Sequence, residues 1–317
     1  MIAAMQRLPA EVMFVVFTRV AFLAALVVLL AIVSPHFLTT DNMVIVLRQA
    51  ALQFLMASGL TLVVLTGGID LSVGAVLGLA ACVGAGFIAT GSVITGILVA
   101  LGAGLACGLV NGVLVAYVGI PSFIATYGML WVAHGLGYVF MKGEVIHGFP
   151  AGFRTLGAGF VGGIPVPVLV GVALLIVLHV VLHLTRFGRA LYAIGGNAVA
   201  SRLIGISVGK NLVAVYALSG VLAAFAGLVV IARVNAADSG TGEELLLTAI
   251  AAVCLGGTSL FGGAGGIVGT AIGSLILALV VNGMNMLSIA TFWQAFAMGV
   301  IVILAVFADV TFKRRMQ

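Results

Sequence analysis

The stretch LTGGIDLSVGAVLGLAA, residues 65–81, decides how the chain has to be interpreted. It places Asp70 behind Gly67 and Gly68, between two long apolar runs. A charged carboxylate at the centre of a bilayer costs about 2.5–3.5 kcal/mol on insertion scales. Asp70 therefore lies either where water or protein partners reach it, or in a segment outside any membrane.

The composition excludes a segment outside the membrane. Of 317 residues, 63% are hydrophobic and 7% are charged, whereas a soluble domain is about 25% charged. A β-barrel would show alternating segments of about ten residues rather than long unbroken apolar runs. We predict one all-α polytopic membrane domain over residues 1–317, with no soluble module attached.

Apolar runs broken by Gly, Pro, Asn or charge predict ten transmembrane helices, since a spanning helix needs about 20 residues. The predicted spans are residues 15–34, 44–66, 71–90, 93–117, 123–141, 165–184, 212–232, 245–260, 266–287 and 291–310. The first run is too long for a signal-peptide core, so we predict that it spans the membrane.

Charge predicts the orientation of these spans, because cytoplasmic loops retain Lys and Arg. The loop 185–210 holds basic residues and no acid, and the C-terminal tail is also basic; the residues are Arg186, Arg189, Arg202, Lys210, Lys313, Arg314 and Arg315. Four spans separate the two segments, so both can be cytoplasmic. Counting back puts Arg7 and the N-terminus on the same side. The acidic loop with Asp238, Glu243 and Glu244 then lies outside.

The segment 143–167 is rich in Gly and Pro and is predicted to be a flexible external loop. Within it, GAGFVG at 157–162 matches the pattern G-x-G-x-x-G. A dinucleotide-binding fingerprint needs a preceding strand and a following helix in a βαβ unit. The segment offers neither, so the pattern is interpreted as part of the loop.

The opening motif has a second copy in the chain. LTGGIDLSVG at 65–74 aligns with CLGGTSLFGG at 254–263, and each copy separates two apolar runs. Paired Gly-interrupted segments indicate a transport site, because backbone freed from a helix is tolerated only beside a cavity or protein. The alternative is that the glycines only allow close helix packing. The predicted substrate pathway consists of Gly67, Gly68, Asp70, Ser72, Gly256, Gly257 and Ser259.

Other polar residues in or near the spans admit two interpretations. They offer hydroxyl and amide groups to a sugar or polyol, or they form interhelical hydrogen bonds worth under about 1 kcal/mol each. We favour hydrogen bonding for any single one. They are Asn111, Ser122, Thr126, Tyr127, Asn235, Asn282, Asn285 and Gln294.

The residues argue against catalysis by this chain. The sequence has no G-x-x-x-x-G-K-[ST] motif, so it does not bind ATP by a P-loop. His179 and His183 lack the Glu that a zinc protease needs, and the three cysteines fall in apolar runs. We therefore predict no disulfide, no metal site and no cofactor. Apart from Asp70, no acid is placed inside a span, because Asp309 lies at the cytoplasmic end of the last one. Ion-coupled carriers usually mark the ion path with buried titratable groups.

Several long motifs resemble a known family. TLVVLTGGIDLSVGAVLGLAA, PSFIATYGML, TRFGRALYAIGGNAVASRLIGI and GTGEELLLTAIAAVCLGGTSLFGGAGGIVGTAIGSLI are similar to the inner-membrane permeases of bacterial ABC sugar importers, in the ribose/xylose/galactose branch. The resemblance implies the ABC-importer permease fold and a second permease copy as a homodimer. It also implies a partner ATPase, which binds ATP and Mg, and a periplasmic sugar-binding protein.

The basic loop contains the segment expected to dock on that ATPase. Asn197 follows two glycines and is a plausible N-cap for a short helix through Ile204. By resemblance, the coupling residues are Arg186, Gly195, Gly196, Asn197, Ala200 and Arg202. The family often has an acid after the Asn, where this chain has Ala198.

We predict that the chain is a bacterial inner-membrane permease that passes a ribose-like pentose, or a related sugar or polyol, into the cytoplasm by alternating access. Asp70 is expected to be held by backbone donors or Ser72, and to fix the broken helix rather than touch substrate. The main alternative is a stand-alone secondary carrier or facilitator for a small polar solute. An intramembrane enzyme is a third and weaker alternative, and nucleic acid is not expected as a partner.

Overall fold

The computed structural model describes residues 10–316, most of which are helical. The elements are α1 (Ala10–Val33), α2 (Thr40–Leu65), α3 (Val73–Ile88), α4 (Val93–Val113), η2 (Leu114–Val118), α5 (Ser122–Met141), β1 (Ile146–His147), α6 (Ala151–Ala158), β2 (Phe160–Val161), β3 (Ile164–Pro165), α7 (Val166–Leu184), α8 (Arg186–Gly196), α9 (Ala198–Leu203), α10 (Val208–Val234), β4 (Ala236–Ala237), α11 (Glu243–Leu255), α12 (Ile267–Met286) and α13 (Thr291–Met316).

Each of the ten predicted apolar segments contains a helix, in agreement with an all-α polytopic membrane protein. Six helices within the described residues are long and apolar enough to cross a membrane, namely α2, α4 with the π-helical turn η2, α5, α7, α10 and α12. The apolar stretches of α1, α3, α11 and α13 are shorter. The number of crossings therefore stays a prediction.

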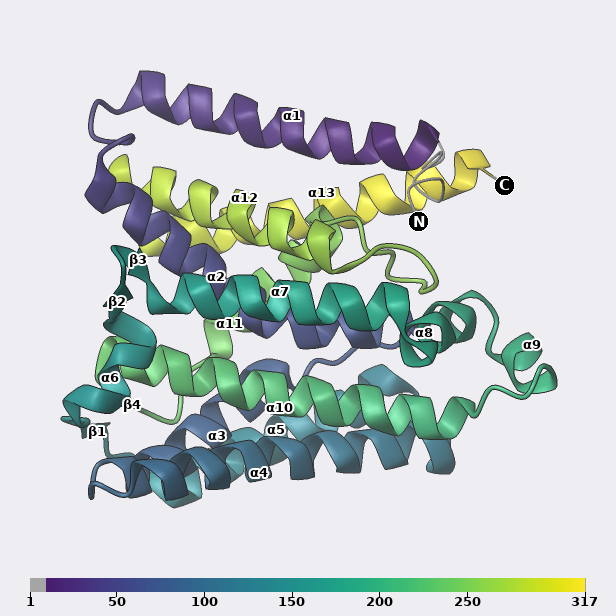
Figure 1. Cartoon of the computed structure of the whole chain (residues 1–317), viewed down its shortest axis with the longest axis horizontal. Helices are drawn as coiled ribbons and strands as arrows, with labels where there is room; N and C mark the ends of the chain where they lie inside the picture. Colours follow the sequence, from purple (N-terminus) through teal and green to yellow (C-terminus); the bar gives the residue numbers. More distant parts are fainter. Residues whose placement is uncertain (1–9, 317) are drawn as a thin grey trace.

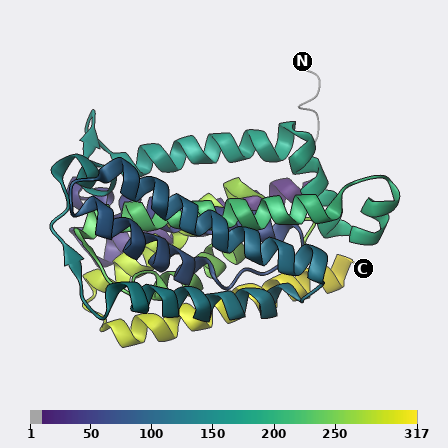
Figure 2. The same cartoon turned by 90° about the horizontal axis from the view of Figure 1, so that it is seen from below.

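The long helices run along one common axis, and the connecting segments gather at the two ends of this axis (Figure 1, Figure 2). The four short strands and α6 lie at one end. Helices α8 and α9 lie at the other end, with the beginning of α1 and the end of α13. The basic loop and both ends of the described chain thus share one end, as the charge pattern predicts. Which side of the membrane this end faces stays a prediction, and Arg7 lies outside the described residues.

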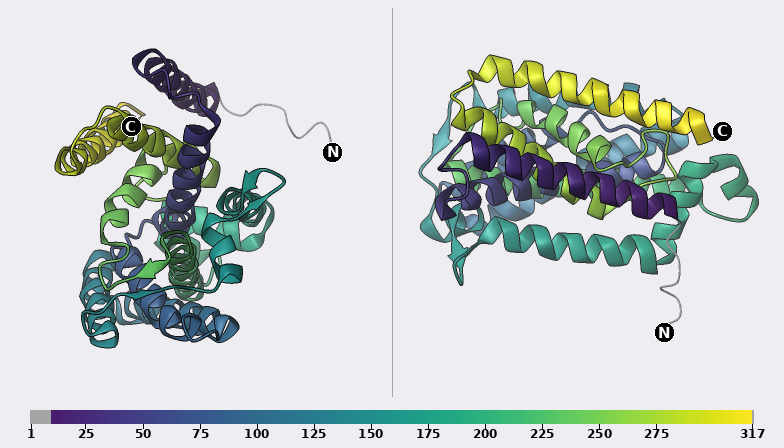
Figure 3. Two further views of the ribbon diagram at one scale, coloured as in Figure 1. Left: turned by 90° about the vertical axis from the view of Figure 1, so that its left-hand side faces the viewer. Right: turned by 90° about the horizontal axis from the view of Figure 1, so that it is seen from above.

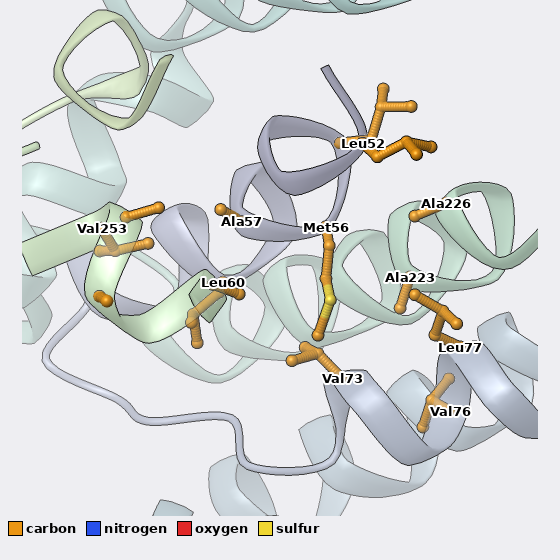
Figure 4. Packing of buried hydrophobic residues seen from close by; sticks show 14 of the residues in the cluster. Leu52, Met56, Ala57, Leu60, Val73, Val76, Leu77, Ala223, Ala226 and Val253 are labelled. Carbon is orange, nitrogen blue, oxygen red and sulfur yellow. The ribbon is translucent and has the colours of Figure 1, made fainter. Parts of the chain in front are cut away.

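The largest hydrophobic core lies between α2, α3, α10 and α11. Figure 4 shows Met56 of α2 directed toward Val73 at the start of α3, with Ala223 of α10 nearby. Helix α1 stands at the edge of the bundle, where it packs on α12 (Figure 3). The core therefore encloses the connection between α2 and α3, which carries Asp70.

The prediction of a flexible loop at 143–167 was wrong. The segment contains α6, the antiparallel pair β2–β3, and β1, which pairs with β4. Phe149 and Phe153 are buried, and a Cβ at Gly157 would overlap the backbone of Arg233 in α10. Gly157 is thus a close-packing position rather than a sign of flexibility. The G-x-G-x-x-G match covers the end of α6, the strand β2 and the start of the turn to β3, which is no βαβ unit.

Helices α4 and α10 approach each other closely along a row of glycines. A Cβ at Gly104 would overlap the carbonyl oxygen of Gly220, and a Cβ at Gly108 would overlap that of Tyr216. Small residues at such positions let transmembrane helices pack backbone to backbone. The spacing of these glycines holds α10 in place against the first half of the chain.

We predict that Gly108→Ala lowers the stability of the folded chain by about 1–3 kcal/mol, because the added methyl group overpacks the α4–α10 contact. Gly102→Ala on the same helix is the control, since a Cβ there meets no atom within 4 Å. The control is expected to be neutral or up to about 1 kcal/mol more stable, because Ala favours helices. Thermal unfolding of the two purified variants in detergent measures the difference, and equal melting temperatures would contradict the packing argument.

Candidate functional site

Asp70 lies in a non-helical connection of seven residues, 66–72, between α2 and α3. Its side chain is 2% exposed. Oδ1 accepts hydrogen bonds from the backbone N–H of Ser72 at 3.0 Å and from Ser72 Oγ at 2.6 Å. Oδ2 accepts one from Ser219 Oγ of α10 at 2.9 Å. Ser72 thus holds Asp70 by hydrogen bonds, as expected from the sequence. The contribution of Ser219 was not predicted.

A second layer of contacts holds these donors in place. Asn111 of α4 donates from Nδ2 to Ser72 Oγ at 2.9 Å. Ser219 packs on α2 at Gly59, where a Cβ would lie 2.9 Å from the Ser219 Cα. A buried carboxylate is tolerated where several donors satisfy its oxygens. Asp70 therefore links the connection between α2 and α3 to α4 and α10.

Helix α5 satisfies the backbone of the same connection. The N–H of Ile69 donates to Ser122 Oγ at 3.1 Å, and the N–H of Leu71 donates to Thr126 Oγ1 at 3.1 Å. Unpaired backbone groups are costly at membrane depth, so a broken helix needs such partners. The sequence left open whether Ser122 and Thr126 contact a sugar or form hydrogen bonds within the protein. In the structure both form hydrogen bonds within the protein.

The second break, 256–266, lies between α11 and α12. Gly257 has a left-handed φ of 69°. A Cβ at this position would overlap the guanidinium of Arg19 of α1. Arg19 also lies near α12, where a Cβ at Gly269 would be 3.4 Å from Arg19 Nη1. No role for Arg19 was predicted from the sequence, although a lone Arg in the first apolar run is a signal.

Hydrogen bonds between residues of the second break hold it in a compact loop. The N–H of Ser259 donates to the carbonyl oxygen of Ala264 at 2.9 Å, and Ser259 Oγ accepts from the N–H of Phe261 at 3.3 Å. Thr258 Oγ1 accepts from the N–H of Gly266 at 3.3 Å. The second break is therefore an ordered loop rather than a simple interruption between two helices.

The two breaks meet each other, and α8 packs on both. The carbonyl oxygen of Leu65 accepts a hydrogen bond from the N–H of Gly263 at 3.0 Å, and a Cβ at Gly262 would lie 2.7 Å from the Gly67 nitrogen. A Cβ at Gly195 of α8 would overlap both Leu65 and Gly263. We call the contact of these five residues the glycine junction.

Tyr192, one turn earlier in α8, adds a hydrogen bond from its phenol to the carbonyl oxygen of Gly265 at 3.0 Å. Burial raises the pKa of this phenol, which keeps it protonated as the donor. Helix α8 is thus held to the second break by a side chain as well as by backbone packing.

The short helix predicted after Asn197 is confirmed. Helix α9 covers Ala198–Leu203, and Asn197 Oδ1 accepts a hydrogen bond from the N–H of Ala200 at 2.9 Å. The exposed residues of this loop include Val199, Arg202, Leu203 and Ile204. The loop therefore presents an apolar and basic tip at the end of the molecule where α8 and α9 lie (Figure 1).

The predicted site residues thus fall into the two breaks and the loop 185–210, and the glycine junction brings all three segments together. Asp70, Ser72 and Ser259 are buried and take part in hydrogen bonds. Their role in a substrate pathway stays a prediction. Asn282 and Asn42 bond to each other between α12 and α2 at 3.1 and 2.7 Å, which is the interhelical interpretation.

Sequence similarity to known proteins extends over most of the chain. Residues 42–306 match the family described as "Branched-chain amino acid transport system / permease component". The ribose import permease protein RbsC of Bacillus subtilis (strain 168) is 43% identical over 287 residues, which is 90% of this chain and 89% of that protein. RbsC of Escherichia coli (strain K12) is 42% identical over 295 residues, with 90% and 92% covered.

The name of a third relative gives a different substrate. The galactose/methyl galactoside import permease protein MglC of Escherichia coli (strain K12) is 35% identical over 307 residues, which is 90% of this chain and 91% of that protein. No solved structure matches the chain significantly. The range matched by the family contains both breaks and the loop 185–210.

We predict that Ser219→Ala lowers the free energy of unfolding by about 1–3 kcal/mol, because Asp70 Oδ2 is left buried without its donor. The control is Ser274→Ala, since Ser274 is also buried but donates only to Thr270 of its own helix. The loss caused by Ser219→Ala is expected to shrink in an Asp70→Asn background. Thermal unfolding of the variants in detergent tests this, and a loss no larger than that of Ser274→Ala would refute the coupling.

Proposed function

Because the chain belongs to this family of permease components and is a multi-pass inner membrane protein, we propose that it is the membrane-spanning subunit of an ATP-driven sugar importer. The relatives named for ribose and for galactose/methyl galactoside support a monosaccharide as the substrate class. The pathway is formed with a second copy of the chain, and a periplasmic sugar-binding protein delivers the sugar. The chain binds no cofactor of its own.

The observation that carries the proposal is the glycine junction. In an ATP-driven importer, ATP binding and hydrolysis by the partner have to change the conformation of the spans. At Gly195, helix α8 touches Leu65, the last residue before the first break, and Gly263 in the second break. Gly195 lies two residues before Asn197, the N-cap of α9. A force on the loop 185–210, which we call the docking loop, therefore reaches both breaks through the backbone contacts at Leu65 and Gly263.

The chemistry of the docking loop fits an ATPase cleft. Val199, Leu203 and Ile204 are 66, 84 and 75% exposed, which is costly in water and favourable in a protein groove. The basic residues of this loop belong on the cytoplasmic side by the positive-inside rule. We therefore propose ten crossings with both termini in the cytoplasm, beside the docking loop.

We predict that Leu203→Glu removes the partner ATPase from the tagged chain purified from its own cells in mild detergent. The substitution puts a charge into the apolar tip that enters the ATPase. Val161→Glu is the control, because Val161 is also exposed, at 61%, but lies in β2 at the opposite end of the bundle. Mass spectrometry of the retained proteins is the measurement.

Stoichiometric retention of an ATPase by the unmodified chain and by Val161→Glu, but not by Leu203→Glu, is the expected result. Recovery of the chain alone, with unaided uptake of labelled ribose into ATP-free liposomes, would instead support the stand-alone carrier.

A further inference from the structure

One edge of α5 carries four rings in sequence, those of Tyr127, Trp131, His134 and Tyr138. Neighbouring ring centroids are 6.3, 6.1 and 5.4 Å apart, so the rings form a continuous ladder. Tyr127, Trp131 and Tyr138 are 51, 58 and 53% exposed. The opposite face of the helix is buried through Ala125, Met129 and other residues at a spacing of four. The ring ladder is therefore a separate, outward-facing edge of this helix.

The ring ladder is about half as long as the hydrocarbon core of a membrane is thick. Tyr138 lies eleven positions after Tyr127, which corresponds to about 16 Å along a helix. The hydrocarbon core is about 30 Å thick. Trp and Tyr are usual at the membrane interfaces, but Trp131 lies in the middle of α5 (Ser122–Met141). Its indole N–H would lose a hydrogen bond in lipid, so this edge is better suited to a polar space than to lipid.

A groove lies beside the ring ladder. Its volume is about 240 Å³, and its walls come from α3, α5 and α11; the lining residues are Gly74, Ala75, Leu130, Trp131, His134 and Leu246. Small-molecule sites combine an apolar and aromatic lining with a few polar groups. The groove is smaller than the roughly 300–1,000 Å³ of sites for drug-sized ligands, which suits a small solute.

The position of the groove connects it to the first break. Gly74 and Ala75 are in the first turn of α3, directly after Asp70 and Ser72. Helix α5 is fixed to the same break by hydrogen bonds from Ile69 and Leu71. A movement of the break therefore changes the shape of the groove. A contact surface that served only to join two copies of the chain would not need this connection.

We propose that the ring ladder of α5 is the wall of the pathway that contacts the translocated monosaccharide. The rings stack on the C–H faces of the sugar, and the phenol hydroxyls and the indole N–H exchange hydrogen bonds with its hydroxyl groups. This inference rests on the proposed function, because it assigns the sugar contacts of the same permease. It makes Trp131 a residue that determines specificity.

The test is uptake of labelled D-ribose and D-galactose into proteoliposomes that hold the chain, its ATPase and its binding protein. Trp131→Ala is expected to lower uptake about tenfold and to change the ratio of the two sugars. Trp131→Phe keeps a ring and is expected to retain most of the uptake. Val139→Ala is the control on another edge of α5, where Val139 is 73% exposed, and its uptake is expected to stay unchanged. The amount of ATPase retained and the melting temperature exclude misfolding.

The outcomes separate the two proposals. If the unmodified complex transports sugar and Trp131→Ala transports both sugars at the same rate and ratio, the ring ladder is not the sugar contact. If Trp131→Ala instead separates the two copies of the chain in cross-linking, the ladder is an interface between copies, and the inference is also overturned. If the unmodified chain retains no ATPase and takes up sugar without ATP, the proposed function fails first. Tyr138→Phe, which removes only a hydroxyl, is expected to lower uptake in part.

Discussion

A buried carboxylate that has to be satisfied by hydrogen-bond donors is the constraint on which the rest of the structure depends. Asp70 takes its donors from Ser72 in its own connection and from Ser219 in α10. The connection between α2 and α3 can therefore keep its shape only while α10 stays in contact with α2. Gly59 of α2 leaves room for Ser219 of α10, and the glycine row of α4 packs against α10 as well. Helix packing and the buried charge thus support each other.

The glycine junction explains why two breaks far apart in the sequence belong to one device. The backbones at Leu65, Gly195 and Gly263 lie very close together. Neither Gly195 nor Gly263 can carry a side chain unless its neighbours move. The junction lies at the end of the bundle that holds α8 and α9 (Figure 1). The ring ladder lies deeper, beside the start of α3. Movement of the docking loop can therefore reach the groove through the first break.

Much of this arrangement could be predicted from the sequence. Apolar runs gave the ten helical segments, and the side chain of Asn197 gave the short helix α9, because both depend on local chemistry. Ser219 could not be predicted, because it is 149 residues from Asp70 and stands in an apolar run among small residues. Arg19 and Gly257 are likewise joined only by the fold. The loop 143–167 was misinterpreted because a glycine needed for close packing and one needed for flexibility are identical in sequence.

The most direct test of the account is the substitution Gly195→Ala, compared with Gly196→Ala. A Cβ at Gly195 would overlap Leu65 and Gly263, whereas a Cβ at Gly196 meets no atom within 4 Å. Sugar uptake per ATP hydrolysed is the measurement, in reconstituted complexes with equal ATPase content. Gly195→Ala is expected to lose most of the uptake, and Gly196→Ala is expected to keep near-normal uptake. Equal uptake by the two variants would contradict a direct mechanical link between the docking loop and the two breaks.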